Sequence, residues 1–143
     1  MTDTVSLEKR SLMMRGIRSK DTKPEVLVRQ WLHRKGLRFR LHRKDLPGKP
    51  DIVLPKWGLV ILVHGCFFHH HQDCKLAYIP KSRTEWWMEK FRKNRERDLK
   101  TLAELEKLGW KVLVIWECQI RKGVYREILL EYFFPQKKKE QEQ

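Results

Sequence analysis

The stretch GLVILV, residues 58–63, is an unbroken apolar run without a charged residue. A run of this length is typical of a strand that is buried on both faces of a sheet. A second run, KVLVIW at 111–116, comes after a long helical pattern. If these two strands lie side by side in a parallel sheet, both of their C-terminal ends emerge at the same edge.

Further elements are expected around these two strands. They are a helix over 22–35, a half-buried strand over 37–43, a short strand over 51–54, a helix over 84–108 and a helix over 125–134. Thr22 and Glu25 have the spacing of a helix N-terminal capping box, and Gly36 ends that helix. Strands preceded, separated and followed by helices predict an α/β fold with a mixed central β-sheet flanked by helices.

The 143 residues suit one compact domain, expected over 21–134, after a basic arm or short helix over 1–20. Residues 135–143 are expected to form a disordered charged tail. The net charge of +14 indicates a polyanionic partner, of which nucleic acid is the commonest. No segment has the roughly 20 apolar residues of a membrane span. The N-terminus also lacks the apolar core of a signal peptide, so a cytoplasmic protein is expected.

Histidines and cysteines gather in VHGCFFHHHQDC, residues 63–74. Three cysteines in a reducing compartment favour metal binding over disulfides. Cys66, Cys74 and Cys118 could hold a structural Zn²⁺ with one histidine, and His69, His70 and His71 are the candidates at this stage. The alternative is that the cysteines are ordinary small core residues at strand ends.

The expected helix over 84–108 carries an apolar stripe interrupted by polar residues. The residues on this face are Trp87, Phe91, Asn94, Asp98, Leu102 and Leu105. A carboxylate on the core side of a helix needs a partner. For Asp98 this is either a basic residue in a structural ion pair or a histidine that acts as a base.

Pro50-Asp51, followed by a hydrophobic strand, is typical of nucleases in which carboxylates at strand ends hold Mg²⁺ against a phosphate. Val63 and Gly65 stand where such a motif has its second acid and its lysine, so that motif in its plain form is absent.

Five segments together resemble the very-short-patch repair (Vsr) DNA mismatch endonuclease family. They are PGKPD at 47–51, VHGCFFHHH at 63–71, TEWW at 84–87, KNRERD at 93–98 and GWKVLVIWEC at 109–118. The resemblance implies a restriction-endonuclease-like α/β core with a structural zinc site. It also implies a Mg²⁺-dependent enzyme that nicks one strand on the 5′ side of the thymine in a T·G mismatch. Such mismatches arise when 5-methylcytosine deaminates, and the nick initiates very short patch repair.

The resemblance also implies residue roles. The catalytic residues would be Asp51, His64, His69, Asp98 and Glu25, with His64 and Glu25 as a supporting pair. Asp51 and the backbone carbonyl of Val63 would bind Mg²⁺, and Cys66, His71, Cys74 and Cys118 would bind Zn²⁺. Phe67, Phe68 and Trp87 would wedge into the base stack, and Lys90, Lys93, Asn94 and Arg97 would contact DNA.

The chain departs from the family pattern at three places. Residue 63 is Val rather than a hydroxyl residue, residue 68 is Phe rather than Trp, and one extra residue precedes Cys74. The extra residue leaves His70 and His71 open as the zinc ligand. The expected partners are double-stranded DNA with a T·G mismatch and candidate mismatch-repair proteins. The protein would be a monomer, because a single mismatch has no two-fold symmetry. It would be associated with the bacterial nucleoid.

Two other functions fit the same sequence features. One is a DNA-binding module that keeps the zinc and the basic face but does not cut. The other is a nuclease of the same fold without a mismatch preference. The aromatic residues at 67–68 and 86–87 favour mismatch intercalation, although one of Trp86 and Trp87 should pack in the core, because adjacent helical residues point about 100° apart.

Overall fold

A computed structural model describes residues 22–135, so the arm predicted over 1–20 and all but the first residue of the tail predicted over 135–143 lie outside the described residues. The helices are α2 (Lys23–Arg34), α3 (Thr84–Lys107), α4 (Glu117–Arg121) and α5 (Tyr125–Phe133). The strands are β1 (Arg40–Leu41), β2 (Ile52–Leu54), β3 (Leu59–His64) and β4 (Lys111–Trp116), and a 3₁₀ turn covers Pro55–Trp57. Both apolar runs of the sequence are therefore strands, as predicted.

The four strands form one mixed sheet in the order β1-β2-β3-β4. β2 pairs antiparallel with both β1 and β3, whereas β3 and β4 are parallel. The parallel register runs from Leu59 opposite Lys111 to His64 opposite Trp116. The mixed α/β fold is confirmed, and the C-terminal ends of β3 and β4 lie side by side at one edge.

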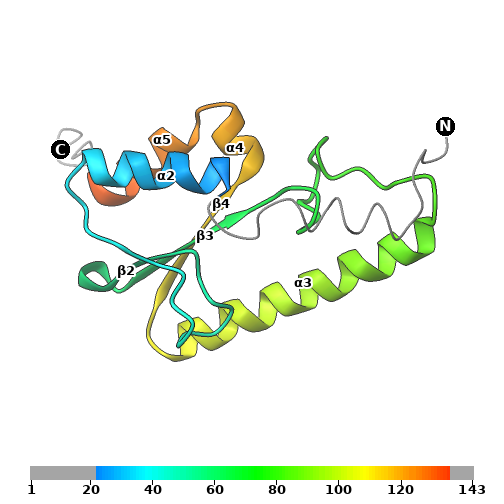
Figure 1. Cartoon of the computed structure of the whole chain (residues 1–143), viewed down its shortest axis with the longest axis horizontal. Helices are drawn as coiled ribbons and strands as arrows, with labels where there is room; N and C mark the ends of the chain where they lie inside the picture. The colour runs from blue at the N-terminus through cyan, green and yellow to red at the C-terminus, as the bar shows by residue number, and fades with distance from the viewer. Residues whose placement is uncertain (1–21, 136–143) are drawn as a thin grey trace, which may run out of the picture.

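Helices cover both faces of this sheet (Figure 1). One core cluster joins β2, β3 and β4 to α2, α4 and α5, with Ile61 and Ile115 fully buried at its centre. The other cluster joins the opposite face to Leu105 of α3. Alternate residues of β3 enter different clusters, which explains why this strand is apolar on both faces.

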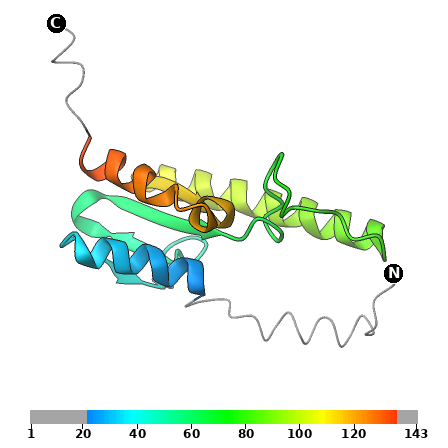
Figure 2. The same cartoon turned by 90° about the horizontal axis from the view of Figure 1, so that it is seen from above.

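α3 extends beyond the sheet, and the segment that links it to β3 lies along its N-terminal half (Figure 2). The helix ends where predicted, since Gly109 has φ +93° and the amide of Trp110 donates to the carbonyl of Leu105. This placement brings α3 against the histidine-rich segment. None of the helices within 22–135 is both long and apolar enough to cross a membrane.

Two local expectations were wrong in extent, and one short helix was not expected. The strand predicted over 37–43 is reduced to Arg40–Leu41, because β2 offers only a short partner. α4, a single short helix directly after β4, was not predicted from the sequence. The run that forms β4 was expected to be buried like β3, but only Ile115 is fully buried, because β4 is an edge strand of the described sheet.

Candidate active site and metal centres

Two side-chain clusters lie at the sheet edge where β3 and β4 end. The segment after β3 folds back so that the amide of His71 donates to the carbonyl of Cys66 at 2.9 Å. Cys118 arrives from the first turn of α4, and its amide donates to Cys66 Sγ at 3.3 Å. The parallel pairing of β3 and β4 therefore joins cysteines that are 52 residues apart in the sequence.

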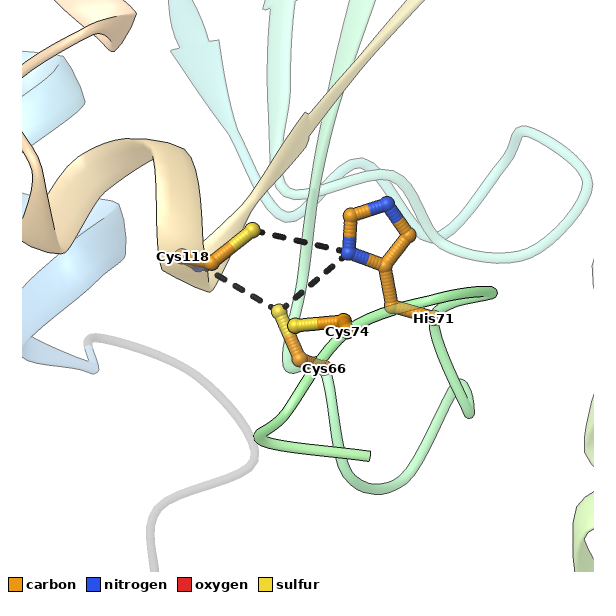
Figure 3. Close-up of side chains that lie close together, drawn as sticks. All are labelled: Cys66, His71, Cys74 and Cys118. Atoms are coloured by element: carbon orange, nitrogen blue, oxygen red, sulfur yellow. Dashed lines mark hydrogen bonds between the residues drawn. The ribbon is translucent and has the colours of Figure 1, made fainter. Parts of the chain in front are cut away.

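Four donors form the first cluster (Figure 3). Atoms of Cys66, His71, Cys74 and Cys118 all lie within 4.8 Å of one another. His71 Nδ1 is 3.6 Å from Cys66 Sγ and 3.5 Å from Cys118 Sγ. A tetrahedral zinc with ordinary bond lengths separates a sulfur and a nitrogen ligand by about 3.6 Å. These three thiols and one imidazole therefore fit Zn²⁺ in both chemistry and spacing.

The backbone decides which histidine joins the cysteines. His70 has φ +46°, in the left-handed region, and its ring stacks on Phe91 at 4.2 Å. His71 then turns toward the cysteines and stacks on Trp116 at 3.9 Å. Burial raises the pKa of the Cys66 thiol to about 12 in the metal-free protein. A bound cation would replace the proton that this thiol otherwise keeps.

The second cluster is an imidazole–carboxylate pair. His69 Nδ1 lies 2.7 Å from Asp98 Oδ2, and both side chains are partly exposed. The ring of His64 stacks on that of His69 at 3.8 Å with an interplanar angle of 2°. Burial, together with the nearby His69, lowers the pKa of His64 to about 4, so His64 is neutral near neutral pH. The Asp98 contact occupies Nδ1 of His69 and leaves Nε2 to act on another group.

A pair of carboxylates lies at the beginning of β2. Asp51 Oδ2 accepts a hydrogen bond from the amide of Val63 at 3.1 Å. The amide and carbonyl of one strand residue point to the same side, so the carbonyl of Val63 also faces Asp51. Burial raises the pKa of Asp51 to about 6, and the nearby Glu25 adds to this rise. Two carboxylates in a buried setting favour a cation between them.

The structure rearranges the expected supporting pair. Glu25 is 2% exposed. One of its carboxylate oxygens lies within 4.8 Å of a potential metal-ligand atom of both His42 and Asp51. His64 groups instead with His69 and Asp98. His64 and Glu25 therefore belong to separate clusters, a division that the sequence did not indicate.

All of these catalytic candidates line one cavity of about 920 Å³. Its lining includes Glu25, Asp51, Val63, His64, His69 and Asp98, with the basic residues Lys49, Lys90, Arg97 and Arg121. On α3, Lys90, Asn94 and Arg97 occupy successive turns along the cavity. Lys93 is exposed but does not line it. A wide cavity with acidic and basic walls suits a phosphodiester that is held beside a cation.

Phe67 is the centre of an aromatic cluster at the mouth of this cavity. Its ring lies 5.2 Å from each of Phe68, Trp87 and Phe91, and 5.0 Å from Tyr78. Phe67 and Phe68 both line the cavity. The side-chain amide of Asn94 donates to the carbonyl of Phe68 at 2.8 Å, which fixes this loop on α3.

The prediction that Trp87 presents its ring to DNA does not fit this structure. Trp87 is 3% exposed and packs behind Phe67, whereas Trp86 is 45% exposed. One of the two tryptophans was expected in the core, and it is Trp87, because it shares the inward face of α3 with Phe91 and Leu105. Trp87 therefore supports Phe67 from behind in this conformation.

Three residues of the site were missed from the sequence. His42 contacts Glu25, and Glu117 accepts the Cys66 amide at 3.2 Å. Trp116 stacks on His71 of the zinc cluster and meets the ring of His64 edge-on. Trp116 and Glu117 stand beside the recognised Cys118, which was a usable signal. His42 has no local signal in the sequence, because it stands at the end of an ordinary alternating segment.

Carboxylates beside an imidazole–carboxylate pair, all in one cavity with basic walls, are groups that the hydrolysis of a polyanion requires. A family model described as DNA mismatch endonuclease Vsr matches residues 2–76. The chain is 52% identical over 130 residues to the type II nicking enzyme V.NmeAIP of Neisseria meningitidis serogroup A, covering 90% of this chain and 92% of that protein. It is 45% identical over 121 residues to the DNA mismatch endonuclease Vsr of Escherichia coli K12, covering 85% and 77%. It also matches the type II nicking enzyme V.XorIIP of Xanthomonas oryzae at 52% identity over 120 residues, covering 84% and 88%.

The chain therefore belongs to the DNA mismatch endonuclease Vsr family. It is an endonuclease, and its substrate is DNA.

Proposed function

We propose that this protein nicks one strand of duplex DNA on the 5′ side of the thymine in a T·G mismatch, using Mg²⁺. The observation that carries the proposal is the meeting of two acidic clusters and an aromatic wedge around one cavity. Two relatives are named nicking enzymes, and the Escherichia coli relative is named a mismatch endonuclease. The sheet and its flanking helices are also compatible with a restriction-endonuclease-like core.

Asp51 and the carbonyl of Val63 would hold the Mg²⁺, with Glu25 close by. Their oxygens match the preference of this ion, and a buried carboxylate with a raised pKa gains most from a cation. When bound, the ion would neutralise charge that develops on the scissile phosphate. The Val63 amide donates to Asp51 Oδ2, which joins the beginning of β2 to the end of β3.

His69 would act as the base that takes a proton from the attacking water. Asp98 holds Nδ1 at 2.7 Å, so it would fix the ring orientation and stabilise the imidazolium that forms. His64, neutral and stacked on the same ring, would restrict its rotation. Lys90 and Arg97 would bind the flanking phosphates along α3.

Phe67 and Phe68 would enter the base stack beside the mismatch, with Trp87 as their support. Separating a base step costs a few kcal/mol and costs least at a mismatch, so a wedge of this kind favours damaged sites. Asn94, through the Phe68 carbonyl, and the zinc cluster, through Cys66 and His71, would hold the segment that carries Phe67 and Phe68. The role of Zn²⁺ would thus be structural: it ties the segment after β3 to α4.

The test is strand-resolved cleavage of labelled duplexes with Mg²⁺, with Ca²⁺ and without a divalent ion. One duplex carries a T·G mismatch, a twin carries C·G, and several flanking sequences are compared. A Mg²⁺-dependent nick 5′ to the mismatched T, absent from the twin, is the expected result. Equal cutting of both would assign a nuclease without mismatch preference, and tight binding without cutting in any sequence would assign a binding module.

A further inference from the structure

His42 lies beside the two carboxylates although it follows an exposed two-residue strand. Its Nε2 is 3.4 Å from Glu25 Oε2, and its side chain is only 23% exposed. The donor atoms of Glu25, His42 and Asp51 lie within 4.8 Å of one another. A nitrogen donor therefore adjoins the oxygen donors on which the proposed function depends.

A backbone hydrogen bond and a left-handed turn place the His42 imidazole beside Asp51. The register that pairs Leu41 with Ile52 continues by one residue, and the amide of His42 donates to the carbonyl of Asp51 at 3.1 Å. His42 has φ +48°, in the left-handed region that few residues other than glycine adopt. The sheet hydrogen bond holds it there, so His42 is fixed to the residue whose carboxylate it neighbours.

We propose that Glu25 and His42 complete the cation site on Asp51 and the Val63 carbonyl, with His42 as its third side-chain ligand, and that the imidazole makes the site prefer ions that accept a nitrogen ligand. This inference rests on the proposed function, because it concerns the same cation site. Octahedral ligands at about 2.1 Å from an ion lie roughly 3 Å apart when adjacent, close to the 3.4 Å between His42 and Glu25.

The consequence is a change in ion selectivity. Mg²⁺ prefers oxygen, whereas Mn²⁺ and the later divalent ions gain more from an imidazole nitrogen. A site of two carboxylates and one imidazole should therefore bind Mn²⁺ more tightly than a site with oxygen donors alone. Mn²⁺ is the useful probe here, because it competes poorly for the thiol-rich zinc cluster.

The experiment measures Mn²⁺ binding to the full-length, zinc-loaded protein by electron paramagnetic resonance. Spin-echo modulation then reports whether an imidazole nitrogen is bound directly to the ion. The variants are His42→Gln and His42→Asn, the second chosen because Asn tolerates a left-handed backbone. The matched control is His33→Gln, which changes an exposed histidine in the last turn of α2, at the opposite end of this helix from Glu25. Asp51→Asn tests the cation site itself.

The expected result is nitrogen modulation in the wild type and in His33→Gln, and its loss in both His42 variants. Mn²⁺ affinity should fall about tenfold on loss of His42, and Mg²⁺ affinity, measured by displacement, by less than about threefold. Nitrogen modulation that persists in both His42 variants would overturn the role of His42 and leave the cation site intact. The same holds if the wild type shows no nitrogen modulation although Asp51→Asn abolishes Mn²⁺ binding. Unchanged Mn²⁺ binding by Asp51→Asn would overturn the cation site of the proposed function as well.

Discussion

Replacing Asp51 with Asn should stabilise the metal-free protein while it abolishes nicking. Asp51 is partly buried, and its pKa is raised from 3.8 to about 6 by burial and by Glu25. Above the higher of these values the native protein holds a carboxylate that would be better solvated in the unfolded chain. Asn has nearly the same shape, and its side-chain oxygen can still accept the Val63 amide.

The difference between 3.8 and about 6 corresponds to about 3 kcal/mol, because one pKa unit is ~1.4 kcal/mol. The sign follows from linkage: a raised native pKa gives stability that is complete below 3.8 and is lost as the pH rises through about 6. The gain in the free energy of unfolding from Asp51→Asn should therefore be about 3 kcal/mol near pH 8 and roughly half of that near pH 5.

Urea unfolding of the zinc-loaded protein without Mg²⁺ measures this gain. With a denaturant slope of about 2 kcal/mol per molar, the midpoint should rise by about 1.5 M near pH 8. Added Mg²⁺ should raise the midpoint of the wild type but not that of the variant, since the variant has lost a ligand. A variant that is no more stable than the wild type near pH 8 would refute the reasoning that burial of the Asp51 carboxylate destabilises the metal-free protein.

Three further perturbations address the other clusters. Asp98→Ala should slow nicking about 10- to 100-fold in single-turnover assays, because a hydrogen bond to a charged group contributes about 1.5–3 kcal/mol; an unchanged rate would remove the His69–Asp98 pair from the reaction. Cys118→Ser should lower both the zinc content and the melting temperature, since it removes one of four zinc donors; full zinc retention would contradict the proposed ligand set. Arg97→Ala should lower the slope of log affinity against log salt by about 1, as expected for one phosphate contact, and an unchanged slope would place Arg97 off the DNA.

Much of the fold was readable because its decisive elements carry strong local patterns. β3 and β4 are continuous apolar runs, and α3 keeps one face over 24 residues before Gly109. β1 was overestimated because strand length depends on the partner strand as well as on alternation. α4 was missed because one helical turn has too few residues to show a period.

The sequence predicted most of the residues of the candidate site but fewer of the contacts between them. The chemistry of Cys66, Cys74 and Cys118 indicated zinc, and the inward position of Asp98 on α3 indicated a partner. The structure supplied that partner as His69. The site of His42 was invisible, since a histidine at the end of an alternating segment has no local signature.

The sequence by itself determined the strands, the long helix, the basic character and the set of metal-binding side chains, because these depend on residue type and on spacing along the chain. Only the tertiary structure decided which of the adjacent candidates act. It set His71 rather than His70 among the cysteines, Trp87 rather than Trp86 in the core, and His42 beside Asp51. Those choices depend on left-handed turns and on strand register, which are fixed by contacts between distant segments.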